Sequence, residues 1–270
     1  MNFGLIIIGD EILSGKREDK HLAKVIELLG TRGLGLSWAR YVGDEPARIT
    51  ADLKEAFASG DVVFSCGGIG ATPDDHTRQC AAAALGVPLA LHPEARDLIL
   101  ERMRDLAREH GVPYEPEREE NRHRLDMGVF PQGAEIIPNP YNKIAGFAVR
   151  AGSGPAGVYF VPGFPVMAWP MIEWVLDTHC AGLQRARTTR EKSVIVFGAM
   201  EAALTPLMEA IEREFAGIKV FSLPSVDHPQ WGRHIELGVK GQPALLDAAF
   251  QALRVGLEAH RATLGPEMVR

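Results

Sequence analysis

The sequence predicts an α/β protein, with a three-layer α/β/α domain built around a mostly parallel sheet and a second, smaller α+β domain. Three observations favour this fold class. Short β-branched runs alternate with amphipathic helical segments in the first half of the chain. Several of these runs end in a glycine beside an acidic residue. A polar, patternless stretch at 184–192 then divides the chain, so we expect domains at 1–182 and 191–262.

The first half of the chain predicts a βαβαβ order. Residues 3–8 form an apolar strand, and a helix with apolar residues at helical spacing follows from Asp19. A second strand at 36–42, a helix around 49–57 and a third strand from Val62 complete the order. Right-handed crossovers bring the ends of parallel strands to one edge of the sheet, where α/β proteins bind their ligands.

The third strand opens into the stretch that carries most information, VVFSCGGIGATPDDHT at 62–77. Its glycines leave amide N–H groups open to a phosphate, and an alanine-rich helix follows. The acid pair Asp74 and Asp75 would repel a phosphate unless a divalent metal lies between them or a carboxylate faces the sugar or base. The stretch therefore predicts a nucleotide site with Mg²⁺.

A simpler interpretation stands beside this one. Asp74 or Thr72 would cap the helix that follows, and the glycines would only make the turn. The pattern is neither the phosphate loop ending in Gly-Lys-Ser/Thr nor a complete dinucleotide fingerprint, because a third glycine is missing and the helix start is acidic.

Further acids lie at the ends of the other predicted strands. Asp10 and Glu11 follow the first strand, and Asp44 follows the second. We expect them to meet Asp74 and Asp75 at one edge, where like-charge repulsion is tolerated only if a metal or shared protons neutralise it. A helix N-cap is an equally good interpretation of Asp44.

The chain continues with a charged helix at 93–110 and a short helix near 119–127. A proline-punctuated loop containing Asn139 follows, and stiff loops of this kind often position ligands. A strand at 158–161 then ends in a turn containing Gly163, which either covers a second phosphate or is a plain connection.

The second domain predicts a βαββα order, with strands at 193–198, 218–223 and 234–240 and helices at 203–215 and 243–260. A unit this small carries little core of its own. We therefore expect docking or a homo-oligomer, either a dimer or a trimer.

Composition excludes several classes of protein. The 270 residues are 46% hydrophobic and 24% charged, as in ordinary globular chains. The net charge of −6 argues against a nucleic-acid binder. No basic leader precedes the first strand and no apolar run approaches the roughly 20 residues that span a bilayer, so we expect no membrane partner. The three cysteines form no CxxC pair, which favours free thiols in the cytoplasm.

Several motifs together resemble the N-terminal domain family of the competence/damage-inducible protein CinA, which is related to the molybdopterin-binding domain of molybdenum-cofactor enzymes. The resemblance covers roughly residues 1–180 and rests on 9–13, 42–44, 67–77, 121–122, 138–140 and 162–165. Two positions depart from the pattern, because Ala71 replaces a usual proline and Asp10 an often-found threonine. The amidohydrolase domain of full-length CinA is not matched, so that activity is not expected.

The resemblance implies two classes of function, and the glycine loop by itself leaves a third class open. The first is a metal-dependent hydrolase that uses Mg²⁺, Mn²⁺ or Co²⁺ to split ADP-ribose into AMP and ribose 5-phosphate. The second is a molybdopterin-binding or adenylyltransferase protein, and the third is a non-catalytic nucleotide-binding protein. Catalytic and metal-binding roles fall to Asp74, Asp10 and Glu11. Ligand contacts fall to Gly67, Gly68, Gly70, Thr72, Asp44, Asp75, Thr77, Asn139 and Gly163.

Overall fold

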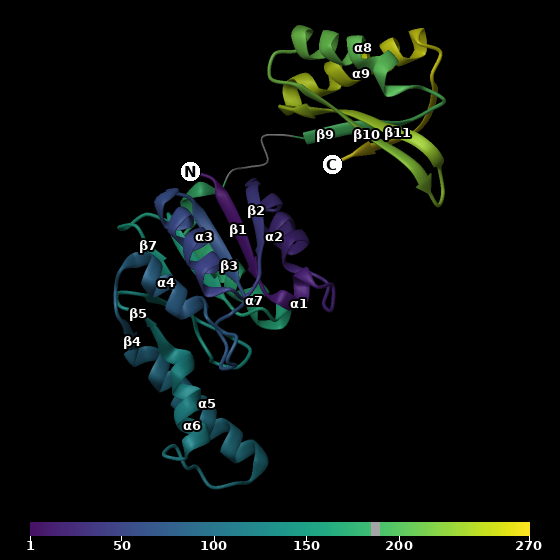
Figure 1. Ribbon diagram of the computed structural model, residues 1–270. Helices are drawn as coiled ribbons and strands as arrows, with labels where there is room; N and C mark the ends of the chain where they lie inside the picture. The colour runs from purple at the N-terminus through teal and green to yellow at the C-terminus, as the bar shows by residue number, and fades with distance from the viewer. Residues whose placement is uncertain (185–189) are drawn as a thin grey trace. The chain divides into compact units, whose positions relative to one another are not determined.

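The computed structural model describes residues 1–184 and 190–270 (Figure 1). Within it the chain forms two compact units, Met1–Gln184 and Arg185–Arg270. The centre of the predicted linker, residues 185–189, lies outside the described residues.

A six-stranded sheet forms the centre of the first unit, in the order β2-β1-β3-β8-β7-β6. Four neighbouring strands run parallel, and the last two pair antiparallel. The strands are β1 (Phe3–Ile8), β2 (Leu36–Val42), β3 (Val62–Cys66), β6 (Glu135–Ile137), β7 (Gly146–Arg150) and β8 (Gly157–Val161). The expected mostly parallel sheet is confirmed.

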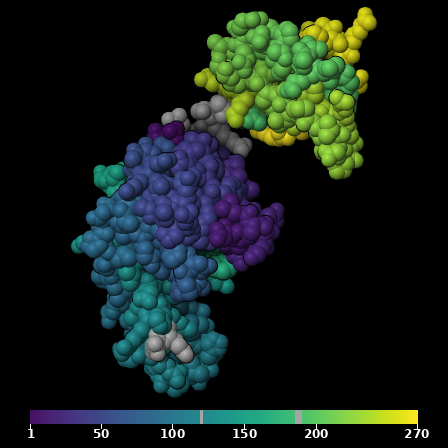
Figure 2. Space-filling view, viewed as in Figure 1, coloured from purple at the N-terminus to yellow at the C-terminus, as the bar shows by residue number. Residues whose placement is uncertain are grey.

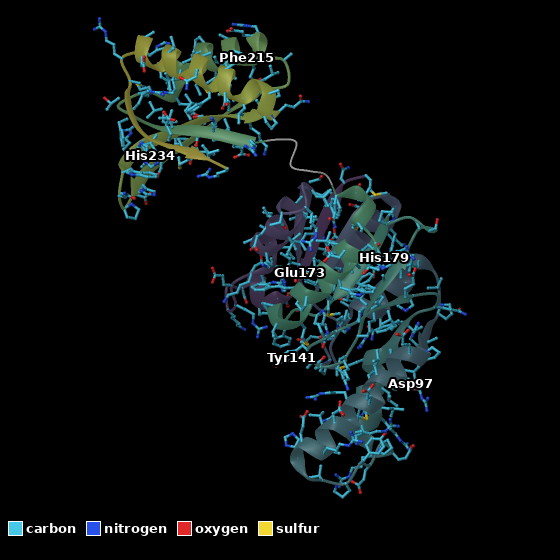
Figure 3. All side chains as sticks on the ribbon, turned by 180° about the vertical axis from the view of Figure 1, so that it is seen from behind. Asp97, Tyr141, Glu173, His179, Phe215 and His234 are labelled. Carbon is cyan, nitrogen blue, oxygen red and sulfur yellow. The ribbon has the colours of Figure 1, made fainter. Side chains whose placement is uncertain are left out.

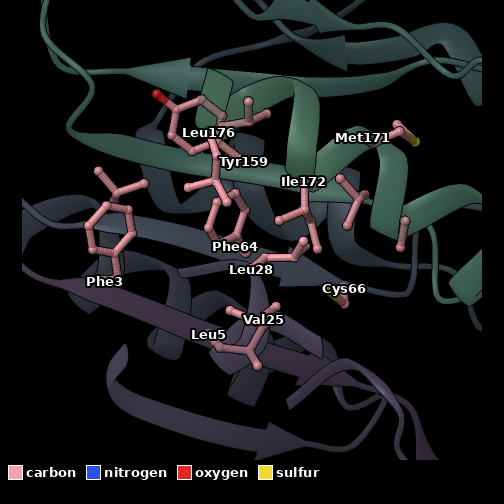
Figure 4. Packing of buried hydrophobic residues seen from close by; sticks show 14 of the residues in the cluster. Phe3, Leu5, Val25, Leu28, Phe64, Cys66, Tyr159, Met171, Ile172 and Leu176 are labelled. Atoms are coloured by element: carbon pink, nitrogen blue, oxygen red, sulfur yellow. The ribbon is translucent and has the colours of Figure 1, made fainter. Parts of the chain in front are cut away.

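Helices cover both faces of this sheet, which completes the three layers. On one face, α2 (His21–Gly30) and α7 (Pro165–Thr178) pack against side chains such as Leu5, Phe64 and Tyr159 (Figure 4). On the other, α3 (Pro46–Ala58) and α4 (Thr77–Leu85) bury a second cluster. Because alternate residues of β1 enter opposite clusters, that strand is apolar throughout.

Short elements extend this frame. A four-residue helix, α1 (Asp10–Leu13), follows β1 directly, and a 3₁₀ helix, η2 (Ala181–Leu183), closes the unit. Between α4 and β6 the chain makes an excursion that protrudes from the body of the unit (Figure 2). The excursion contains β4 (Leu89–Leu91), α5 (Pro93–His110), α6 (Glu119–Leu125), the 3₁₀ helix η1 (Asp126–Gly128) and β5 (Val129–Pro131). Asp97 marks α5 in Figure 3.

The second unit is an antiparallel sheet, β10-β11-β9-β12, with two helices on one face (Figure 1). Its elements are β9 (Arg190–Phe197), α8 (Glu201–Glu214), β10 (Lys219–His228), β11 (Gly232–Gly241), α9 (Pro243–Ala259) and β12 (Thr263–Val269). The predicted βαββα order omits β12, which the boundary at 262 cut off. Pro266 fits this strand because β12 lies at the sheet edge, where an unpaired position needs no N–H.

None of the helices in the described ranges combines the length and the apolar character needed to cross a membrane.

Candidate functional site

The carboxyl ends of the parallel strands bring several loops of the first unit around one cleft. Its cavity volume is about 450 Å³, within the usual range for small-molecule sites. The glycine loop after β3, from Gly67 to Asp75, forms a large part of its lining. The rest comes from the loops after β1 and β2, the segment 142–145 and the turn 162–164. The predicted strand-end edge is therefore hollow where the motifs meet.

The first two glycines of the loop leave no space for a side chain. Gly67 has a φ of +107° and Gly68 a φ of +69°. A Cβ built on Gly67 would lie 2.3 Å from the Ile8 carbonyl oxygen, and one on Gly68 would lie 2.1 Å from Thr77 Oγ1. These glycines therefore allow a close approach of the backbone to the start of α4.

The start of α4 holds four consecutive carbonyl groups of the loop. Thr77 donates its Oγ1–H to Gly67 O at 3.1 Å and its N–H to Gly68 O at 3.0 Å. The Arg78 guanidinium donates to the next two carbonyl oxygens, those of Ile69 at 3.1 Å and Gly70 at 2.7 Å. The loop is thus fixed from behind, on the helix side.

The amide groups of the same peptides are left open. Across residues 1–184 and 190–270, no protein group accepts the N–H of Gly68, Ile69, Gly70 or Ala71. All four residues line the cleft. Successive backbone N–H groups of this kind form a concave binding site for an anion.

Carboxylates gather beside the glycine loop, as the sequence predicts. Asp10 and Asp44 are cross-linked, because the Asp10 amide donates to Asp44 Oδ2 at 2.9 Å and the Asp44 amide to Asp10 Oδ1 at 3.1 Å. Burial raises the pKa of Asp44; the Asp10 N–H opposes this rise, and the nearby charges of Asp10, Glu11 and Asp74 add to it. Glu11, Asp44 and Asp74 line the cleft, whereas Asp10 lines only an adjoining hollow.

Neither helix-cap interpretation holds. His76 occupies the N-cap position of α4 and Glu45 that of α3, and neither helix has a side-chain cap hydrogen bond. Thr72 instead donates its N–H to Asp75 Oδ2 at 2.8 Å, which closes the turn 72–75. Asp74 remains exposed at the rim of the cleft.

Two predicted ligand contacts have supporting positions instead. Thr77 is fully buried and faces the loop from behind. Asn139 is 4% exposed, donates to Asn142 Oδ1 and Ile144 O, and accepts the N–H of Tyr141. Asn139 shapes the loop that carries exposed Tyr141 (Figure 3) and presents Asn142 to the cleft. The sequence predicted direct ligand contacts for these two residues because it does not show whether a short polar side chain in a motif points toward the ligand or toward the protein.

Gly163 does line the cleft, in the turn before α7. Its carbonyl oxygen lies 3.0 Å from Nε2 of buried His21. A Cβ on Gly163 would lie 3.5 Å from the Gly67 Cα, an ordinary contact, so the two turns pack closely without strain.

Two residues of the cleft were missed by sequence reasoning. The guanidinium carbon of Arg17 lies 5.4 Å from the ring centroid of Phe164, and Nη1 of Arg17 lies 3.7 Å from Glu11 Oε1. Phe164 is 54% exposed, which is high for a phenylalanine and leaves a ring face open to a flat ligand. The signal for Arg17 was its position in a Gly-Lys-Arg run just after the first acid pair.

A metal fits this site only together with its ligand. Within the described ranges, no three His, Cys, Asp or Glu side chains form a group that could hold a metal ion. Mg²⁺ commonly uses one or two protein carboxylates and completes its shell with water and substrate phosphates. Glu11, Asp44 and Asp74 suit that arrangement because they line the same cleft as the open amides.

The model of one protein family, described as "Probable molybdopterin binding domain", matches residues 4–180. The chain belongs to this family. It is 34% identical over 263 residues to a CinA-like protein of Anaeromyxobacter dehalogenans (strain 2CP-C), covering 96% of this chain and 52% of that protein. A CinA-like protein of Anaeromyxobacter sp. (strain Fw109-5) is 33% identical over 208 residues, covering 76% and 48% respectively.

The chain thus spans about half the length of these two relatives. A crystal structure of the protein CinA, with unknown function, from Thermoplasma acidophilum matches with a TM-score of 0.54 at 24% identity. That match covers 66% of this chain and 98% of the other, and it shows the shared fold. The resemblance expected from the motifs is confirmed.

Proposed function

We propose that the first unit is a metal-dependent nucleotide pyrophosphatase that hydrolyses ADP-ribose to AMP and ribose 5-phosphate. One observation carries the proposal: four open amides of the glycine loop line the same cleft as the carboxylates of Glu11, Asp44 and Asp74. Amides bind the negative charge of a diphosphate, whereas carboxylates repel it unless a cation lies between. Both together suit a diphosphate that arrives with a divalent metal.

The chain's own residues have distinct roles in this reaction. The amides from Gly68 to Ala71 hold non-bridging oxygens of the diphosphate. Asp74 accepts a proton from the attacking water, whose oxygen bonds to phosphorus while the bridging P–O bond breaks. The bridging oxygen leaves with the electron pair of the broken bond, Asp74 releases its proton to the solvent, and the products are AMP and ribose 5-phosphate. A divalent metal, held by Glu11 and Asp44, would supply Lewis-acid stabilisation of the charge on the phosphoryl oxygens.

The remaining lining suits the flat part of a nucleotide. The open face of Phe164, with Met127, Ile144 and Met167, gives the cleft an apolar portion. An adenine ring stacks favourably on such an aromatic face. A pterin ring has the same flat shape, and together with the family membership this supports a second candidate, a molybdopterin-binding function.

Hydrolysis by the purified chain separates the two candidates. ADP-ribose, FAD and NAD are each incubated with Mg²⁺, Mn²⁺ or Co²⁺, and AMP is quantified by chromatography. We expect Asp74→Asn to fold normally and to lose on the order of 10²-fold in rate, about 3 kcal/mol of transition-state stabilisation. Asp97→Asn, an exposed carboxylate change on α5, is the matched control.

Two results would count against the proposal. Hydrolysis by Asp74→Asn at the wild-type rate would remove Asp74 from the mechanism. No hydrolysis of any dinucleotide by the wild type would refute the pyrophosphatase and favour the pterin candidate, which binding of an adenylated pterin then tests.

A further inference from the structure

Arg78 is a buried cation that the proposed chemistry does not use. Arg78 is 5% exposed, and among the side chains that the structure describes, which exclude those of residues 119–120 and 185–189, no carboxylate oxygen lies within 4.0 Å of it. Burial lowers the pKa of Arg78, and the negative charges of Asp75 and Asp126, which lie farther away, partly oppose this lowering. Burying a charge without a direct counter-charge is costly. Its hydrogen bonds to two backbone carbonyls are what offset this cost.

Those two hydrogen bonds set the direction of two amides. In a trans peptide the C=O and the next N–H point in opposite directions across one plane. Nη1 of Arg78 holds the Ile69 carbonyl, so the N–H of Gly70 points away from Arg78. Nη2 holds the Gly70 carbonyl, so the N–H of Ala71 points away as well.

The side away from Arg78 is the cleft. Arg78 lines a different hollow, together with His76 and Asp126, and does not line the cleft. Gly70 lines only the cleft, and Ala71 lies between the two and lines both. Thr77 acts in the same way on the two preceding peptides, through its hydroxyl and its amide. Two adjacent residues of α4 therefore turn four successive amides to one side.

We propose that Arg78 is a positioning residue for anion binding: it never touches the ligand, but holds the amides of Gly70 and Ala71 toward the phosphate groups in the cleft. The inference rests on the proposed function only in taking the anion to be a phosphate group. The fork of the guanidinium is essential, because its two nitrogens reach two carbonyls at once. A lysine ammonium in the same place keeps the charge but lacks this planar fork.

The test measures binding of inorganic pyrophosphate, with Mg²⁺ present, to the full chain. We expect Arg78→Met and Arg78→Lys each to bind at least about tenfold more weakly than the wild type, a loss of about 1.4 kcal/mol. Arg150→Met is the matched control, since Arg150 also bonds a backbone carbonyl, that of Gly154, but pairs with Glu135 and does not line the cleft. Its affinity should equal that of the wild type.

Comparing Arg78→Lys, which keeps the positive charge, with Arg78→Met, which removes it, separates the effect of the guanidinium geometry from the effect of the charge. If Arg78→Lys binds pyrophosphate as tightly as the wild type, attraction by a buried charge explains the site and the inference is wrong. Circular dichroism and thermal unfolding establish which variants fold.

The wild-type chain supplies an independent measurement if neither variant folds. In a ¹⁵N-labelled sample, pyrophosphate with Mg²⁺ should shift the amide signals of Gly70 and Ala71 more than those of Gly86 and Gly111, which end helices elsewhere. Unchanged Gly70 and Ala71 signals would overturn the inference. Binding at these amides without any hydrolysis of ADP-ribose would instead refute the pyrophosphatase alone.

Discussion

Replacing Gly68 by alanine should damage both the stability of the first unit and its anion site. Alanine at a φ of +69° costs about 1 to 2 kcal/mol because its Cβ crowds the following carbonyl. The new Cβ would also lie 2.1 Å from Thr77 Oγ1. Thr77 must then move and give up its buried hydrogen bond to Gly67 O, which adds about 1 to 3 kcal/mol. We expect a total loss of about 2 to 5 kcal/mol.

Gly86 provides a matched control at the other end of α4. It has the same φ of +69°, but a Cβ there meets no atom within 4 Å. Gly86→Ala should therefore lose only the stability that alanine costs at a positive φ. Both variants lower the conformational entropy of the unfolded chain equally, so that effect cancels between them. The difference between the two variants isolates the contact with Thr77.

Urea unfolding of the full chain, followed by circular dichroism, gives the two free energies, and pyrophosphate titration gives the two affinities. Gly68→Ala should be less stable than Gly86→Ala by about 1 to 3 kcal/mol, and only Gly68→Ala should lose pyrophosphate binding. Equal stability and equal affinity would refute the description of the loop as fixed by Thr77.

Three further predictions follow from other parts of the first unit. Asp61 is buried, which raises its pKa, but hydrogen bonds from the Asn2 amide and the Trp38 ring hold that pKa below its usual value. Its stabilising effect is therefore present above about pH 4 and is lost as the pH falls through the lowered pKa. By urea unfolding, Asp61→Asn should cost about 1 to 2 kcal/mol at pH 7 and progressively less as the pH falls through that lowered pKa. A cost that does not change with pH would contradict this. Gly163→Ala should keep wild-type stability, because its Cβ meets only Gly67 Cα at 3.5 Å; a lower melting temperature would show that the turns pack more tightly. Burial raises the pKa of the Cys66 thiol and raises that of the Cys180 thiol to about 11. At pH 7 both thiols should therefore react with iodoacetamide far more slowly in the folded chain than in urea. Fast labelling of the folded chain would refute their burial.

The parallel half of the sheet could be predicted because its signal is local. Strands β1, β3 and β8 are buried on both faces, so each appears in the sequence as an apolar run. The three-residue strands β4, β5 and β6 are too short to show a period, and they form by pairing, β4 with β5 far along the chain and β6 with the following strand β7. Strand β12 was missed for a related reason, since Gly265 and Pro266 interrupt its pattern while β9 supplies its pairing.

The place of the site was predictable, but the direction of its side chains was not. Asp10 and Asp44 meet because parallel strands end together, as the spacing of the motifs indicates. Arg17 and Phe164 are far apart in the sequence, and only the closed fold brings them together. Arg78 gave no signal, because a charged residue in a helix is usually exposed.

Within the motif, the side chains that hold the loop differ from the one that is exposed at the rim of the cleft. Thr72 and Asp75 bond each other across their turn, and Thr77 and Arg78 hold the loop carbonyls. Their polar groups are satisfied by the loop itself, so removing them should act on ligand binding through loop shape. Asp74 is the carboxylate of this segment that is exposed and lines the cleft. Mutation of Asp74 should therefore change the rate of hydrolysis without changing stability, whereas mutation of Thr77 or Arg78 should change binding.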